Sequence, residues 1–178
     1  MFTQKKDMDW LVGLTDADGC FSLTDRTITF KISLTHKNKQ ALHRVKKIIG
    51  RGNIKQYKNE VIYRIRDRDG LRDCVFPIFE KSPLFTQKYH YYLKAKEALT
   101  ILESNESILD QNNRIKKLKS SWKNIPLKCH WKNQEPSKEW LCGFVEGDGS
   151  FFITKNQEKY VHAFAVTQKT DKHLLEWI

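Results

Sequence analysis

Two stretches of the chain repeat the same pattern of apolar and small residues. Residues 10–23 read WLVGLTDADGCFSL, and residues 140–153 read WLCGFVEGDGSFFI. In the first stretch, Trp10, Leu11 and Leu14 recur at helical spacing and form an apolar stripe. Each stretch therefore predicts a helix with one apolar face. Because the two copies lie 130 residues apart, they indicate a duplicated domain rather than a solenoid.

Small residues interrupt both predicted helices at the same places. Gly13 and Ala17 lie four residues apart in the first copy, and Gly143 and Gly147 do so in the second. Small residues at this spacing let two helix backbones come close, so we expect the copies to pack against each other about a pseudo-twofold axis. The glycines that follow the helices are expected to serve as C-caps; they are Gly19 and Gly149.

After the first motif the periodicity changes from helical to alternating. Residues 27–35 and 61–66 alternate apolar with polar side chains, and residues 51–60 form a further strand and turn before the second of these. Amphipathic helices are predicted at residues 38–49, before Gly50, and at 88–102. The order α-β-β-α-β-β-α predicts an α+β fold. Its antiparallel sheet has helices on one face, while Lys, Arg, Thr and Tyr occupy the other.

The periodic pattern divides the chain into three parts. Residues 1–103 form the first αββαββα repeat, and residues 104–134 form a connecting segment with one further Lys-rich helix. Residues 135–178 begin the second repeat, where Thr167 aligns with Thr35 and the hairpin is two residues longer. The second repeat lacks counterparts of the second strand pair and the closing helices. We therefore expect the chain to be a truncated or split product.

Charge favours a polyanionic partner. Lys and Arg total 32 against 21 Asp and Glu, a formal net charge of +11, which fits a nucleic-acid binder or a basic surface that is only solvated. The four cysteines form no C-x-x-C pair and are expected to be reduced thiols. The N-terminus has no apolar signal segment, and no apolar run approaches the length of a membrane span, so no membrane partner is expected.

Each motif ends in a carboxylate beside its glycine. If the copies pack as expected, Asp18 and Asp148 meet at adjoining helix C-termini, where the helix dipoles are also negative. The two carboxylates would repel each other unless a cation lies between them. Oxygen ligands of this kind predict Mg²⁺ rather than zinc.

The doubled motifs LVGLTDADG and LCGFVEGDG resemble the signature of the LAGLIDADG homing endonucleases of the single-chain, two-motif type. The resemblance implies that the motif helices form the interface between two αββαββα units and that the sheets straddle duplex DNA. It also implies that Asp18 and Asp148 bind a divalent metal, with the backbone carbonyls of Gly19 and Gly149 nearby.

The resemblance assigns further roles around the metals. His36 and Gln168 match polar residues that position water, although His36 departs from the family pattern and also fits a surface residue at a strand end. Lys88 matches the basic residue near the scissile phosphate, and Asp16 and Glu146 match the earlier acidic position of each motif. With the metal ligands, the residues expected to act in catalysis are Asp18, Asp148, Lys88, Gln168 and His36.

These features predict a site-specific DNA endonuclease that makes a double-strand break and promotes intron homing. The alternatives are an intron RNA maturase with the same fold, whose partner would be its own intron RNA, and a DNA-binding regulator without cleavage. A complementary fragment that completes the second repeat is a further expected partner, and an organelle, mitochondrion or chloroplast, is the expected location. The residues expected to contact DNA are Lys31, Ser33, Lys55, Tyr57, Arg64, Arg66 and Lys172.

Overall fold

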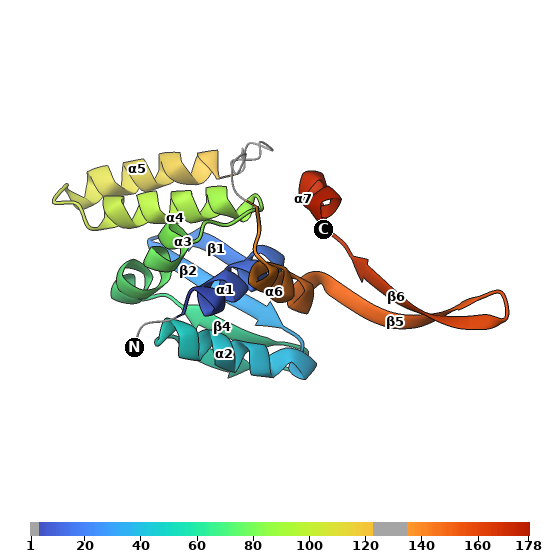
Figure 1. Ribbon diagram of the computed structural model, residues 1–178. Helices are drawn as coiled ribbons and strands as arrows, with labels where there is room; N and C mark the ends of the chain where they lie inside the picture. The colour runs from blue at the N-terminus through green and yellow to red at the C-terminus, as the bar shows by residue number, and fades with distance from the viewer. Residues whose placement is uncertain (1–3, 123–134) are drawn as a thin grey trace.

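The computed structural model describes residues 4–122 and 135–178. Its first unit follows the expected α-β-β-α-β-β-α order, with additional helical segments before the last helix and a further helix after it (Figure 1). The elements are α1 (Lys5–Asp18), β1 (Gly19–Thr24), β2 (Thr27–Leu34), the 3₁₀ turn η1 (His36–Asn38), α2 (Lys39–Ile49), β3 (Asn53–Gln56), β4 (Val61–Ile65), the π-helical turn η2 (Gly70–Val75), α3 (Phe76–Lys81), α4 (Lys88–Leu102) and α5 (Ile108–Ser121).

The sheet of the first unit is antiparallel, with the strand order β1-β2-β4-β3. Its inner face is formed by the apolar residues that alternate along the strands, and these side chains are buried beneath α1, α2, α3 and α4. Five aromatic rings fill the centre of this core: Phe21, Phe30, Tyr63, Phe79 and Tyr92. The duplicated α+β fold with an antiparallel sheet is therefore confirmed.

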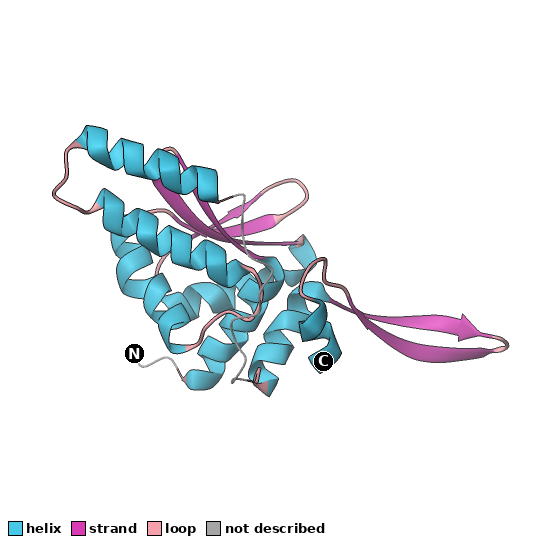
Figure 2. Cartoon of the chain, turned by 90° about the horizontal axis from the view of Figure 1, so that it is seen from above, coloured by secondary structure: helices cyan, strands magenta, loops and turns pink. Residues whose placement is uncertain are grey.

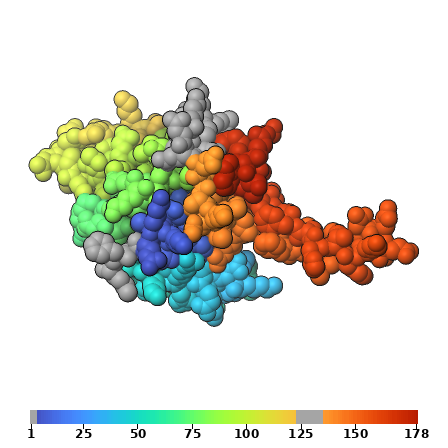
Figure 3. Space-filling model, in the orientation of Figure 1, coloured from blue at the N-terminus to red at the C-terminus, as the bar shows by residue number. Residues whose placement is uncertain are grey.

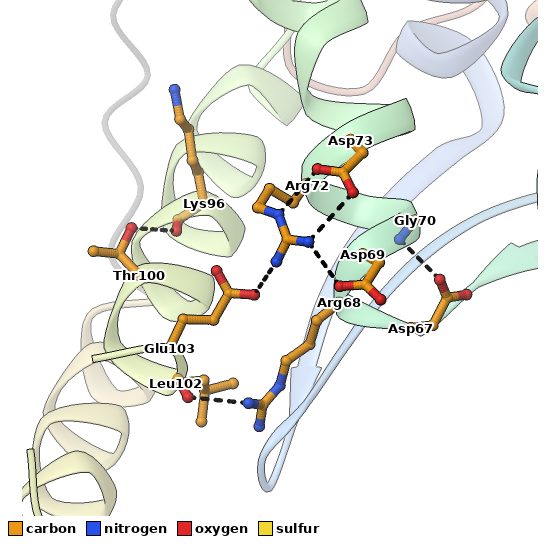
Figure 4. Close-up of polar contacts among 10 residues, drawn as sticks. All are labelled: Asp67, Arg68, Asp69, Gly70, Arg72, Asp73, Lys96, Thr100, Leu102 and Glu103. Carbon is orange, nitrogen blue, oxygen red and sulfur yellow. Dashed lines mark hydrogen bonds and ion pairs between the residues drawn. The ribbon is translucent and has the colours of Figure 1, made fainter. Parts of the chain in front are cut away.

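The expectation missed the segment between β4 and α4, where η2 and α3 lie. Arg72 of η2 donates hydrogen bonds to Asp69 at 2.7 Å, Asp73 at 3.0 Å and Glu103 at 2.7 Å, and the last of these links η2 to the end of α4 (Figure 4). The carboxylates of Asp73 and Asp69 raise the pKa of the Arg72 guanidinium above its usual range. The sequence of η2 has neither helical nor alternating periodicity, so the pattern of apolar and polar residues did not predict this turn.

The described part of the second unit consists of α6 (Lys138–Asp148), β5 (Gly149–Asn156), β6 (Lys159–Val166) and α7 (Lys172–Trp177). The β5–β6 hairpin extends away from the body of the molecule (Figures 2 and 3). The β5–β6 ladder has eight residue pairs where the β1–β2 ladder has six, so the second hairpin is longer by two residues on each strand rather than by two residues in all. Helix α7 returns to the body, where Leu174 is buried and Trp177 packs edge-on against Trp140.

Helices α1 and α6 lie side by side at the centre of the molecule (Figure 1). A Cβ on Gly13 would collide with the backbone carbonyl of Trp140, and a Cβ on Gly143 would collide with the carbonyl of Trp10. The two contacts are reciprocal, as a pseudo-twofold axis requires. The expected close approach at the small residues is therefore confirmed.

Cys20, Cys74 and Cys142 are free thiols, and Cys129 lies outside the described residues. Part of the connecting segment, residues 123–134, also lies outside them. Within the described ranges, no helix has the length and apolar character that crossing a bilayer would require.

Replacing Gly143 with Ala tests the helix contact. In an isolated helix this change is favourable by about 1 kcal/mol. Here the added methyl group collides with the Trp10 carbonyl, so we expect the free energy of unfolding to fall by about 2–3 kcal/mol in urea denaturation. The control is Cys142→Ala at the neighbouring exposed position of α6. A Gly143→Ala variant as stable as the control would contradict the contact.

Candidate metal centre at the helix junction

Two tryptophan–carboxylate hydrogen bonds cross the α1–α6 interface. Trp140 donates through Nε1 to Asp16 Oδ2 at 2.8 Å, and Trp10 donates through Nε1 to Glu146 Oε2 at 3.0 Å. Both tryptophans and both acids lie at equivalent positions of the two motifs. The pairs are reciprocal, so they fix the rotation of one helix against the other and bring the C-terminal ends of both helices to the same place.

Asp16 also connects this interface to the start of α4. Its fully buried carboxylate accepts hydrogen bonds from the backbone amides of Phe85 (2.9 Å) and Thr86 (3.0 Å), and from the Thr86 hydroxyl (2.6 Å). Burial raises the pKa of Asp16, and these hydrogen bonds oppose that shift. Asp171, just before α7, accepts from the next backbone amide, that of Gln87, at 3.2 Å. Two carboxylates therefore receive the three consecutive backbone amides that lead into α4, those of residues 85–87.

Asp18 and Asp148 end the two motif helices and share one partly buried site. Burial first, and then repulsion from Asp148, raises the pKa of Asp18 to about 6, against the opposing charge of Lys88. Burial also raises the pKa of Asp148, against the effects of Lys88 and Gln168. Gly147 provides room for this arrangement, because an added Cβ would lie 2.8 Å from Asp18 Oδ2. The expected meeting of the two carboxylates is present.

Lys88, the first residue of α4, places its ammonium group beside the two carboxylates. Its ammonium group donates hydrogen bonds to the carbonyl of Thr15 at 3.2 Å and to the carbonyl of Ala17. These carbonyls belong to the last turn of α1, where a positive charge is favourable. Burial lowers the pKa of Lys88, and the charges of Asp16, Asp148 and Asp18 oppose that change. Asp16 sets the position of the backbone just before Lys88, so it also positions the lysine.

The two residues expected to position water occupy different surroundings. Gln168, just after β6, donates through Nε2 to Asp148 Oδ2, which places it at the carboxylate pair. The His36 ring instead has its Nε2 3.1 Å from the backbone carbonyl of Lys58, in the turn between β3 and β4. The structure therefore brings Gln168 to the acidic site and shows His36 in contact with a surface turn.

The donor set fits a hard divalent cation. Burial raises the pKa of both carboxylates, and the charge of Asp148 raises that of Asp18 further, so a cation between them would stabilise the charged forms. In the parts of the chain that the structure describes, no cluster of three or more His, Cys, Asp or Glu side chains adds further ligands. Mg²⁺ commonly uses one or two carboxylates and completes its shell with water and phosphate oxygens, so this pair is sufficient.

The C-cap glycines lie beside the carboxylates. Gly19 and Gly149 both have extended backbone rather than a left-handed conformation, with φ of −76° and −87°. A side chain on Gly19 would collide with Thr15, and one on Gly149 would collide with Val145. Glycine is therefore required at both positions by the close passage of the chain over the last helical turn.

The outer face of the first sheet gathers most of the residues expected to contact DNA. Lys31 of β2 lies opposite Arg64 of β4, and Arg64 lies opposite Asn53 of β3. In the next row Ser33 and Lys55 lie opposite Ile62 from its two sides. The remaining expected residues lie past the strand ends or on α7: Tyr57, Arg66 and Lys172.

Sequence reasoning missed the residues that hold the centre together. Trp10 was assigned only to the apolar stripe, and the hydrogen-bonding roles of Trp140, Thr86 and Asp171 were not predicted. One signal was present for the tryptophans. They recur at the same place in both motifs, six residues before Asp16 and Glu146, and an indole N–H that is buried needs an acceptor.

Comparison with known proteins agrees with this geometry. The sequence pattern described as LAGLIDADG endonuclease matches residues 11–99, half of the chain. The probable intron-encoded endonuclease Cox1-I1b of Schizosaccharomyces pombe is 34% identical over 191 aligned positions, covering 95% of this chain and 47% of that protein. The chain therefore spans about half the length of this curated relative.

Two solved structures share the fold and are more than 25% identical in sequence to this chain. The LAGLIDADG homing endonuclease I-SmaMI bound to cleaved DNA matches with a TM-score of 0.76 at 26% identity, over 95% of this chain and 69% of that one. I-GzeII in complex with its DNA target matches with a TM-score of 0.76 at 28% identity, over 94% and 68%. With the paired motifs and their helix junction, these matches show that the chain belongs to the LAGLIDADG endonuclease family.

Replacing Asp16 with Asn tests the link between the helix junction and α4. The change turns one acceptor into an amide donor that faces backbone amides and the Trp140 indole, so we expect the free energy of unfolding to fall by about 3 kcal/mol. Hydrogen exchange at the Phe85 and Thr86 amides should also become faster. The matched control is Glu146→Gln, whose side chain has one hydrogen bond, to Trp10, and is exposed. Equal effects of the two changes would contradict the role of Asp16.

Proposed function

We propose that the protein is a metal-dependent endonuclease that cuts both strands of duplex DNA at a specific site. The observation that supports this most directly is the joining of Asp18, Asp148 and Lys88 at the adjoining ends of α1 and α6. The names of the relatives support the same activity, since they are intron-encoded or homing endonucleases and one is bound to cleaved DNA.

The residues of the site suit phosphodiester hydrolysis. A divalent cation bound by Asp18 and Asp148 would lower the pKa of a water molecule and stabilise negative charge at the phosphate. Lys88 supplies a fixed positive charge beside that position without needing to rearrange. Gln168 holds the Asp148 carboxylate and keeps an amide oxygen available to accept from a water molecule. Mg²⁺ is the cation proposed, on the basis of the oxygen donors.

The basic outer face of the first sheet is the proposed DNA-reading surface. A twisted antiparallel ribbon fits the major groove, where Lys and Arg reach the O6 and N7 acceptors of guanine. Lys31 and Arg64 lie in one cross-strand row, and Lys55 lies in the next. Arg66 and Tyr57 extend this surface, and Lys172 on α7 is proposed to contact phosphate from the second unit.

We also propose that the protein promotes homing of the intron that encodes it, in a mitochondrion or another organelle. Intron-encoded and mitochondrial relatives support this location. The paired carboxylates favour the nuclease over an RNA maturase or a non-cleaving regulator, because neither of those activities uses a metal-binding acid pair. His36 remains a proposed water-positioning residue, and its contact with Lys58 makes it the weaker of the two candidates.

Replacing Asp18 or Asp148 with Asn tests the nuclease function. We expect either change to abolish double-strand cleavage in Mg²⁺ while DNA affinity, measured in Ca²⁺, stays within about tenfold, because the acids serve the metal more than the phosphates. The assay uses a labelled duplex that spans the intron insertion site. Asp25→Asn, in the exposed β1–β2 turn, is the control. Unchanged cleavage by either motif variant would remove that residue from the active site.

Replacing Lys31, Lys55, Arg64 and Arg66 together with Ala tests the sheet face. Binding should weaken, and the plot of log affinity against log salt should flatten, by about one unit of slope for each phosphate contact that is lost. The matched control replaces Lys116 and Lys117 with Ala; both are exposed residues of α5, which packs against α4. A salt slope equal to that of the unaltered protein would show that this face does not contact DNA.

A further inference from the structure

The β5–β6 hairpin has two chemically distinct faces. Cross-strand pairing places Phe151 opposite Phe164, and Ile153 opposite His162, on one face. On the other face Phe152 lies opposite Ala163, and Ser150 and Thr154 lie opposite Ala165 and Val161. The first face corresponds to the buried face of the first unit, because Phe151 occupies the place of Phe21. The second face therefore corresponds to the outer, DNA-facing side.

The outer faces of the two hairpins differ at equivalent positions. With Phe151 at the place of Phe21, the cross-strand pairing places Ala165 where the first unit has Lys31, Ala163 where it has Thr29, and Val161 where it has Thr27. Phe152 takes the place of Ser22. The basic and hydroxyl groups of the first hairpin are thus replaced by methyl groups and an aromatic ring in the second.

These apolar side chains are available to a ligand. Phe152 is 48% exposed and Val161 is 39% exposed, and the hairpin extends free of the body of the molecule (Figure 3). Lys159, at the tip of the same face, is exposed and can contact phosphate. In the major groove the feature that Ala, Thr and Phe side chains recognise is the C5-methyl group of thymine.

We propose that the two units recognise different features of DNA: the sheet of the first unit reads guanine through Lys31 of β2 and Arg64 of β4, and the β5–β6 hairpin reads thymine methyl groups through Phe152, Val161 and Ala163. This inference rests on the proposed DNA-binding function and adds to it the base preference of each half-site. It predicts a target whose half under the β5–β6 hairpin contains thymines at positions where loss of a single methyl group weakens binding.

The experiment begins with a binding site selected from a random duplex library by the protein in Ca²⁺. In the selected duplex each thymine is then replaced in turn by deoxyuridine, which removes only the methyl group. Each guanine is replaced in turn by 7-deazaguanine, which removes only the N7 acceptor. The half of the duplex under the hairpin is identified by a hydroxyl-radical cleavage reagent attached at the β5–β6 turn. The reagent is attached to the cysteine of a Gln157→Cys variant. The four native cysteines of that variant are replaced by Ser: Cys20, Cys74, Cys129 and Cys142.

We expect each deoxyuridine under the β5–β6 hairpin to weaken binding about fourfold, since burial of one methyl group has that effect on an equilibrium constant. The 7-deazaguanine changes should act mainly in the other half. Ala165→Lys, at the position that matches Lys31, should add a guanine-sensitive position to this half. Phe152→Ser should remove deoxyuridine sensitivity beneath it, and Tyr160→Ser, an exposed residue on the opposite face, should leave it unchanged.

The possible outcomes separate this inference from the function on which it rests. Failure to select any DNA sequence would overturn both. Specific binding with deoxyuridine effects that are absent, or equal in both halves, would overturn only the methyl-reading inference. Loss of sensitivity in Tyr160→Ser rather than Phe152→Ser would show that the opposite face contacts DNA, and would also overturn it. Circular dichroism of each variant confirms that the exposed substitution leaves the fold intact.

Discussion

The close backbone contact between α1 and α6 is the constraint on which the rest of the structure depends. Only glycine at positions 13 and 143 permits each helix to lie against a carbonyl of the other. At this separation Trp10 and Trp140 reach across to Glu146 and Asp16, so the glycines and the hydrogen bonds require each other. A wider separation would break both indole hydrogen bonds and leave buried donors without acceptors, at a cost of about 1–3 kcal/mol each.

The same contact sets the chemistry of the candidate centre. Because the helices are related by a pseudo-twofold axis, their C-terminal acids arrive at one place, where burial raises the pKa of both and repulsion from Asp148 adds to the rise at Asp18. Asp16 links α1 to the start of α4, because it accepts hydrogen bonds from the backbone amides of Phe85 and Thr86. Lys88, two residues further on, thereby lies at the end of α1. Stability and the proposed catalytic function therefore rely on one short stretch of α1. The destabilising acid pair is retained at the position where a cation would compensate for it.

Much of the fold could be predicted from the sequence because it depends on local pattern. The alternation of apolar and polar residues in β2 and β4, like the apolar stripe of α2, shows which side of each element faces the core. Gly50 marks the end of α2. The repeat of Gly13 at Gly143 predicted the helix pair, and the acids at its end predicted the meeting of Asp18 with Asp148. The turn η2 was missed, since its irregular backbone is held by ion pairs around Arg72 that have no periodicity. The second carboxylate partner of the α4 amides, Asp171, depends on tertiary packing that a linear pattern does not encode.

The most direct test of the account is the pKa of Asp18, measured by carbon-13 NMR titration of its carboxyl group in the metal-free protein and in the Asp148→Asn variant. The account predicts a value of about 6 in the unaltered protein, and a lower value when the neighbouring charge at Asp148 is removed. The amide preserves the shape of the side chain, so the change reports charge rather than packing. A pKa for Asp18 that is unchanged in the variant would contradict the central claim that the two motif carboxylates share one site.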